Sequence, residues 1–151
     1  MKALALAFLA TAFQAVTAAP PDVAGVWQIN AGWGPPEAPY LHGRMRPRCV
    51  FEQDGEAITG TCKGYSSDGT VEGTVQGNHV RFYWTHYPRP DPVPTLLVYG
   101  RDLGGPHLDA EGRHTTRVMF DGHIDEHGLL AGDVEDKDQP SLTGQFRAAK
   151  E

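Results

Sequence analysis

The residues best suited to hold a small molecule lie in one aromatic-rich segment, residues 79–86. Alternate side chains of a strand point to the same face, so Phe82, Trp84 and His86 share one side of this segment. If that side faces inward, Phe82 and Trp84 form a stacking wall and His86 adds a polar contact at the rim. The alternative is an ordinary packed core, and both interpretations stay open at this point.

A stretch rich in Gly and Pro, residues 31–46, precedes that segment in the chain. We expect it to be a long loop, because no hydrophobic period runs through it. It carries Trp33 and Tyr40, two aromatic side chains that a mouth loop of a binding protein can place against a ligand. We therefore add Trp33 and Tyr40 to the candidate ligand-binding residues.

Residues 123–127 include two His, one Asp and one Glu, the residue types that hold zinc or copper. On a helix, two histidines at this spacing share a face. Here Gly122 and Gly128 flank the segment and favour a hairpin turn instead. We expect an exposed turn, and we predict no metal and no cofactor.

Three arginines alternate just before the first cysteine, at Arg44, Arg46 and Arg48. On a strand they form a basic ridge that can pair with a carboxylate or phosphate. The interpretation that we prefer is a solvated strand edge that discourages the addition of another strand.

Motifs of catalysis are missing from the sequence. It has no nucleophile elbow, no Gly-rich phosphate loop, no zinc-protease motif and no redox Cys pair. An enzyme is therefore the less favoured class, although a barrel can assemble an acid or base from different strands.

A repeated pattern, apolar-x-Gly-x-apolar, predicts the elements that position these side chains. It occurs at residues 58–62, 71–75, 120–124, 130–134 and 142–146. Residues two apart share a face, so each central Gly lies on the same inward face as its apolar neighbours. Because Gly has no Cβ, each copy is typical of a strongly curved strand in a barrel.

Strand and turn signals alternate at short, regular intervals along the chain, and no window has helical periodicity. We expect strands at residues 25–30, 48–53, 57–63, 70–76, 79–86, 95–101, 113–125, 129–135 and 141–148. Loops rich in Pro and Gly are expected at residues 87–94 and 102–112. The predicted fold is all-β, a small antiparallel up-and-down barrel of eight or nine strands, since closure removes exposed strand edges.

The two cysteines, Cys49 and Cys62, flank a predicted hairpin. If Asp54 to Ala57 form its loop, Phe51 faces Gly60 and Cys49 falls opposite Cys62. The same register puts the apolar residues on one face and the polar ones on the other. We therefore predict a structural Cys49–Cys62 disulfide.

The first 18 residues have the layout of a secretory signal peptide, with an early Lys2, an apolar run and small residues before the expected cleavage after Ala18. The apolar run is shorter than the roughly 20 residues of a membrane-spanning helix. We expect residues 19–151 to form a single barrel domain that is secreted or periplasmic. The net charge of −6 argues against a nucleic-acid partner, and no membrane span is predicted.

Several short motifs make the chain resemble the calycins, the superfamily that includes lipocalins and avidins. They are Gly25-Val26-Trp27, the segment at residues 58–61, and a basic residue near the end, Arg147 or Lys150. The resemblance implies that Trp27 plugs one end of the barrel and that the late basic residue, which we assign as Arg147, packs over it. The chain also resembles uncharacterised exported bacterial proteins.

Departures from avidins indicate that biotin is not the ligand. Avidins have a ligand-binding Tyr where this chain has Cys62, and an Asp in their last strand where residues 143–146 read Thr-Gly-Gln-Phe. Our leading hypothesis is an exported barrel that binds a small, largely apolar molecule. The alternative is an interaction module that binds an unknown protein through loops 31–46 and 87–112. A third, weaker possibility is an isomerase or cyclase with His86 as acid or base.

Overall fold

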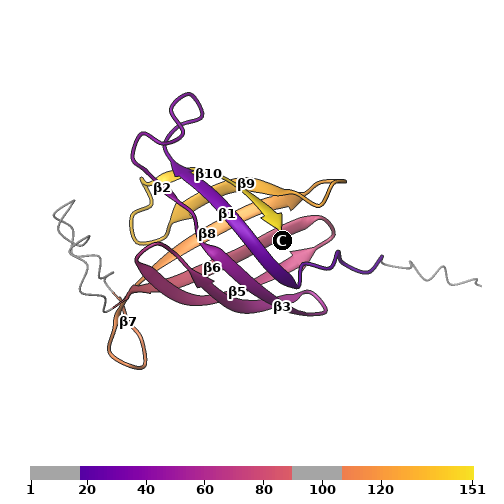
Figure 1. The fold of residues 1–151 in the computed structure, drawn as a ribbon, viewed down its shortest axis with the longest axis horizontal. Helices are drawn as coiled ribbons and strands as arrows, with labels where there is room; N and C mark the ends of the chain where they lie inside the picture. Colours follow the sequence, from indigo (N-terminus) through magenta and orange to yellow (C-terminus); the bar gives the residue numbers. More distant parts are fainter. Residues whose placement is uncertain (1–17, 90–106) are drawn as a thin grey trace, which may run out of the picture.

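The computed structural model describes residues 18–89 and 107–151, and within them every regular element is a β-strand. Figure 1 shows these strands wrapped around a common axis. The strands are β1 (Gly25–Trp33), β2 (Gly43–Met45), β3 (Arg48–Asp54), β4 (Ala57–Lys63), β5 (Ser67–Gln76), β6 (His79–Pro88), β7 (His107–Leu108), β8 (His114–Ile124), β9 (Leu130–Asp136) and β10 (Thr143–Lys150).

The sheet closes on itself. Its order is β10-β9-β8-β6-β5-β4-β3-β1, every pairing is antiparallel, and β1 pairs with β10 from Trp27↔Lys150 to Trp33↔Gly144. The barrel therefore has eight strands, while β2 adds to β1 and β7 adds to β8. The predicted all-β, antiparallel up-and-down barrel is confirmed.

The strand limits differ from the predicted ones near the first loop. Residues 31–33 belong to β1 and residues 43–45 form β2, so the expectation of one loop over residues 31–46 was wrong at both ends. Pairing with β10 and with β2 holds these residues extended in spite of their composition. The expected strand at 95–101 lies outside the described residues, as does nearly all of the expected signal peptide.

Within the described part of the chain, no helix has the length and apolarity needed to span a membrane.

Inward-facing side chains form one buried cluster along the barrel axis. At its centre the rings of Phe82 and Phe120 stack with centroids 4.7 Å apart. Phe51 meets Phe82 edge-on at 5.0 Å, and Phe146 meets Phe120 edge-on at 5.1 Å. Such aromatic pairs add about 0.5–1.5 kcal/mol each beyond the area that they bury. The described interior is thus packed at mid-height.

The repeated glycines stand where neighbouring strands approach closely. A Cβ on Gly144 would lie 1.7 Å from the carbonyl oxygen of Gly32, and one on Gly132 would lie 2.1 Å from that of Asp121. A Cβ on Gly60 would likewise lie 2.0 Å from the carbonyl oxygen of Val50. Only glycine leaves room for these contacts, so the pattern marks the curvature that closes the barrel.

The hairpin of β3 and β4 has the predicted register. Cys49 pairs with Cys62 and Phe51 with Gly60, and the two cysteines form a disulfide with Cα atoms 4.0 Å apart. Asp54 and Ala57 also pair, which shortens the expected four-residue loop to a turn of two residues. Both cysteines are buried in the core, so the bridge is structural.

The two ends of the barrel differ. We call one the Trp27 end: here the indole Nε1 of Trp27 donates to the carbonyl oxygen of Val23 at 2.8 Å, and Gln53 holds the backbone of Val23. The other we call the Trp84 end, where β1 ends at Trp33 and β6 ends just beyond His86. The candidate ligand-binding residues lie toward the Trp84 end.

Candidate binding site at the Trp84 end

Trp84 and His86 lie on the inward face of β6, in line with the buried Val80 and Phe82. Their rings are 4.3 Å apart between centroids and are tilted by 32°. The residues opposite them on β5 are Val71 and Gly69. The predicted shared face of this strand is therefore present.

One ring nitrogen of each side chain is buried without a partner. The Nε1 of Trp84 and the Nδ1 of His86 make no hydrogen bond within residues 18–89 and 107–151. Buried polar atoms of this kind each cost about 1–3 kcal/mol, and native proteins seldom leave them unpaired. Two of them on adjacent rings point to a partner outside the described part of the chain.

Burial also sets the protonation state of His86. It lowers the pKa of His86 from 6.5 to about 4, because the charged imidazolium is poorly solvated there. The carboxylate of Asp138 opposes this shift with a smaller effect. At neutral pH the ring is uncharged, so Nδ1 is an acceptor or a single donor according to the tautomer.

Two glycines leave space for the Trp84 indole. A Cβ on Gly69 would lie 2.7 Å from Nε1 of Trp84, and a Cβ on Gly64 would lie 3.0 Å from Cη2 at the far edge of the ring. The backbone of β5 and of the β4–β5 connection thus lies directly against the indole. Larger residues at these positions would displace the ring, so both glycines position the site.

Phe82 and Trp33 face the interior as expected, but in different surroundings. Phe82 is fully buried in the central aromatic cluster, with Phe120 against its face. Trp33 lies at the Trp84 end of β1, where it pairs with Gly144 and is 8% exposed. Phe82 therefore forms the packed base of the candidate site, and Trp33 lies at the same end of the barrel.

Tyr40 does not join these residues. It is half exposed in the loop between β1 and β2, and its ring lies against Gly32 on the outer wall. The guanidinium of Arg44 lies over the ring, 4.9 Å from its centroid, and donates to Asn30. Trp84 and Tyr40 thus lie on opposite sides of the barrel wall.

The structural residues are placed as follows. Trp27 is buried at its end of the barrel, as the calycin resemblance implies. Arg147 lies on the outer wall, because Phe146 and Ala148 on either side of it face the core. Lys150 instead pairs with Trp27, packs against Gly25 and approaches the backbone oxygen of Asp22 at 3.4 Å. Arg147 thus faces away from Trp27, whereas Lys150, the other basic residue of the resemblance, lies opposite Trp27 on β10.

The expected turn is present at residues 125–129, while His123 and Ile124 end β8. The carboxylate of Asp125 accepts hydrogen bonds from the backbone N–H groups of His127 and Leu129, and these bonds lower its pKa. The side chain of His127 is exposed. Across residues 18–89 and 107–151, no group of three or more His, Cys, Asp and Glu is arranged to hold a metal ion.

The arginine ridge lies on the outer surface, where two members have partners. Arg44 donates to Asn30 at 2.9 Å, and Arg48 forms a two-pronged ion pair with Glu151. This arrangement agrees with the solvated edge that we preferred.

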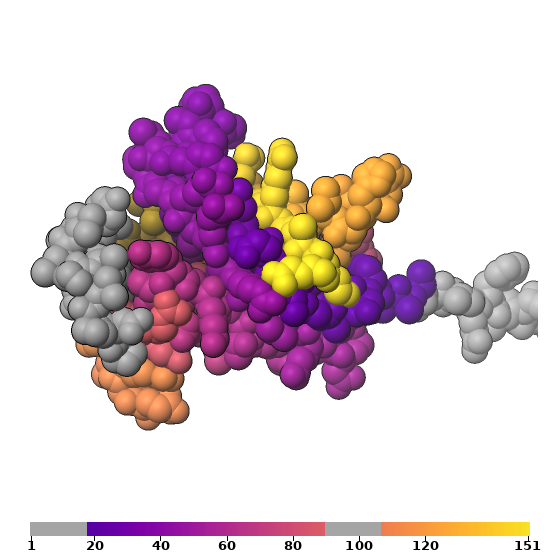
Figure 2. Space-filling view, viewed as in Figure 1, coloured from indigo at the N-terminus to yellow at the C-terminus, as the bar shows by residue number. Residues whose placement is uncertain are grey.

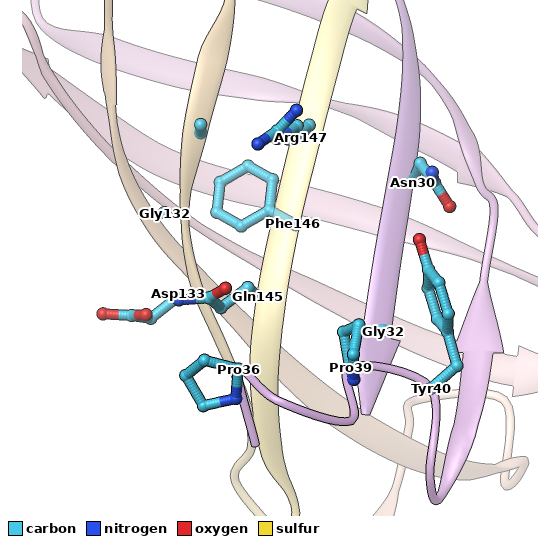
Figure 3. Close-up of a pocket in the computed structure, with 11 residues that line it drawn as sticks. Asn30, Gly32, Pro36, Pro39, Tyr40, Gly132, Asp133, Gln145, Phe146 and Arg147 are labelled. Carbon is cyan, nitrogen blue, oxygen red and sulfur yellow. The ribbon is translucent and has the colours of Figure 1, made fainter. Parts of the chain in front are cut away.

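Sequence reasoning missed a feature of the outer wall. Two hollows of about 670 and 480 Å³ lie over β9, β10 and β1. Figure 3 shows the first of them. The lining of the two hollows comes mainly from outward-facing strand positions, from Pro36, Pro39 and Tyr40 of the loop, and from Asp125 and Leu129 of the β8–β9 hairpin. The core residues Leu130, Phe146 and Ala148 also border them. Small residues at outward positions, Gly32 and Ala131, are the signal in the sequence that indicates depth on this wall.

Comparison of the chain with protein-family models, with curated proteins and with solved structures gave no match.

Proposed function

We propose that this protein is an exported, calycin-like barrel that binds a small molecule at the Trp84 end. The ligand has an apolar body that lies against Trp84, Trp33 and the Phe82 base. It also has one polar group that reaches the buried nitrogens of Trp84 and His86.

The single observation that carries this proposal is the pair of unpaired ring nitrogens. The Trp84 indole N–H can only donate, so it requires an acceptor such as a carbonyl, carboxylate or hydroxyl oxygen. His86, which is neutral at pH 7, can accept from a hydroxyl or donate to the same oxygen. A ligand oxygen between these groups would remove the cost of both buried atoms.

Two further observations support an exported binding protein. The Cys49–Cys62 disulfide is typical of oxidising compartments, and the first 18 residues have the layout of a signal peptide. The avidin ligand Tyr is replaced here by Cys62, whose sulfur is bonded to Cys49. This replacement supports a ligand other than biotin.

The experiment uses two probes that combine an apolar body with an acidic acceptor, 8-anilinonaphthalene-1-sulfonate and decanoate. We expect saturable binding of one or both, followed by tryptophan or probe fluorescence. Trp84→Phe keeps an aromatic ring but removes the donor, so it should weaken binding about tenfold. The matched control is Trp27→Phe, since Trp27 is equally buried but already bonded to Val23.

Binding that is equal in wild type and Trp84→Phe would contradict the proposed site. Absence of binding for both probes, with the barrel folded, would contradict a ligand of this class.

An interaction module remains the second candidate, on the basis of exposed apolar side chains. Leu41, Tyr65 and Leu108 all belong to connections or short strands at the Trp84 end and are 64% or more exposed. A partner that binds there would lose affinity on Leu41→Ser plus Leu108→Ser and would be unaffected by Trp84→Phe. The opposite pattern would reject this candidate.

A further inference from the structure

The two hollows on the outer wall form one groove, which we call the outer groove. Both are lined by Asn30, Ala131 and Arg147, so the hollows meet at these residues. One extends toward the loop at residues 34–42, and the other extends toward the hairpin at residues 125–129. Figure 2 shows this loop (purple, top) and this hairpin (orange, upper right) standing on either side of the yellow atoms of β10.

The loop over the groove is held firmly. Gly32 has no Cβ, and a Cβ there would lie 2.2 Å from the carbonyl oxygen of Pro39 and 2.7 Å from the Tyr40 ring. Backbone hydrogen bonds Gly34 N→Thr143 O and His42 N→Trp33 O fix both ends of the loop to the barrel. Three prolines, Pro35, Pro36 and Pro39, further limit its freedom, so little ordering entropy is lost when a ligand binds.

Arg147 lines both hollows and so lies where they meet. Figure 3 shows it in the first hollow, near Phe146. Its guanidinium is exposed and makes no ion pair within the described residues, whereas Arg44, Arg48 and Arg117 all have polar partners. Asp133 lines the same groove, yet the two charges do not pair. A guanidinium in this situation is available for two parallel hydrogen bonds to a carboxylate.

The rest of the lining combines one aromatic face with side-chain amides. Tyr40 presents its ring beside Asn30, and Gln145 lies on the neighbouring strand. The amide oxygen of Asn30 accepts from Arg44, which leaves its NH₂ group for a ligand. Gln28 also lines the second hollow, but its NH₂ group donates to the carbonyl oxygens of Ile29 and Pro47, which leaves its amide oxygen as an acceptor. Amides donate to and accept from hydroxyl groups, and a carboxylate accepts from them. An aromatic face attracts C–H groups that carry partial positive charge.

We propose that the outer groove binds a uronate-containing oligosaccharide. A sugar carboxylate pairs with Arg147, a pyranose ring lies on Tyr40, and hydroxyl groups bond to Asn30, Asp133 and Gln145. The positions from Gln145 to Ala149 on β10 span about 13 Å, which is longer than one sugar ring.

Other occupants fit this groove less well. A peptide cannot join the sheet here, because β9, β10 and β1 are each paired on both sides. Inorganic phosphate would occupy only the surroundings of Arg147 and would leave Tyr40 and the amides of Asn30 and Gln145 without a partner. A purely apolar ligand would leave the amides and both charges unpaired.

Calorimetric titration of the full chain with trigalacturonate and trimannuronate tests the proposal, with maltotriose as the neutral counterpart. We expect at least one uronate trimer to bind more tightly than maltotriose. Arg147→Gln should weaken that binding about tenfold or more, because a charge-assisted pair is lost. Arg46→Gln is the matched control: Arg46 is also exposed and has no ion pair within the described residues, but it lies outside both hollows.

Tyr40→Leu should also weaken binding, whereas Trp84→Phe should leave it unchanged because Trp84 faces the interior. The proposal is overturned if neither uronate trimer binds, if Arg147→Gln binds as well as wild type, or if maltotriose binds equally well. Equal competition by hexaglutamate or inorganic phosphate would show simple anion capture and would also overturn it.

Discussion

The ring centroids of Trp84 and His86 lie 4.3 Å apart on the inward face of one strand. Each ring has a buried nitrogen with no hydrogen-bond partner among the described residues. Trp27, at the other end of the barrel, is just as buried but donates to Val23. Trp27 therefore has a structural role with its hydrogen bond made, whereas the N–H of Trp84 is a buried donor that a ligand can use.

The contrast predicts different stability effects for the same substitution. Trp27→Phe loses ring volume and a satisfied hydrogen bond, while Trp84→Phe loses similar volume but removes an unsatisfied buried donor. In the ligand-free protein we expect Trp27→Phe to lower the free energy of unfolding by about 1–2 kcal/mol more than Trp84→Phe does. Urea unfolding at pH 7 measures both. An equal or larger loss for Trp84→Phe would mean that its nitrogen is satisfied in the folded state.

The lowered pKa of His86 predicts acid sensitivity. Between pH 6.5 and about 4 the unfolded chain takes up a proton at His86 and the folded chain does not, so stability falls as pH falls through this window. The full effect is on the order of 3 kcal/mol. The stability lost between pH 7 and pH 5 in urea titrations should be smaller for His86→Gln than for wild type. Identical losses in the two proteins would show that His86 is not buried in its neutral form.

Barrel closure predicts unequal tolerance at two glycines. Gly144→Ala places a Cβ against the carbonyl oxygen of Gly32, where β10 and β1 join, and should cost more than about 3 kcal/mol or prevent folding. Gly55→Ala, in an exposed turn with φ +60° and open space, should cost only about 1–2 kcal/mol. Thermal melting of both variants provides the comparison. Similar melting temperatures would argue against close contact of β1 and β10.

The disulfide predicts a measurable stabilisation. Cys49 and Cys62 are 13 residues apart, and closing a loop of this size removes about 3 kcal/mol of unfolded-state entropy. The double variant Cys49→Ala/Cys62→Ala should be less stable by roughly that amount, and a reducing agent should destabilise wild type but not the variant. An unchanged urea midpoint on reduction would contradict a bridge that supports the core.

Much of the barrel could be predicted because independent local patterns agree. In the β3–β4 hairpin, the cysteine pair, the turn residues and Gly60 all require one register, and the structure has that register. The predicted end of the first strand was wrong at residues 31–33, where Gly and Pro nearby hide an extension that pairing with β10 and β2 explains. Long-range pairing of this kind leaves no local signal in the sequence.

The site was predicted less completely. The face shared by Phe82, Trp84 and His86 follows from the two-residue period of a strand, but whether a buried nitrogen finds a partner depends on residues distant in the chain. Tyr40 was misplaced because a loop has no period that reveals which side of the wall it covers. The outward direction of Arg147 could have been predicted from the sequence. Gly144, Phe146 and Ala148 share the inward face of the last strand, so residue 147 between them faces outward.

The central claim concerns the Trp84 indole, and nuclear magnetic resonance can observe it directly. The protein has three tryptophans, so its nitrogen-15 spectrum has three indole N–H signals, which Trp→Phe variants assign. On titration with 8-anilinonaphthalene-1-sulfonate or decanoate, we predict a saturable shift of the Trp84 signal while that of Trp27 stays in place. A Trp84 signal that does not move while either probe binds elsewhere would contradict the account.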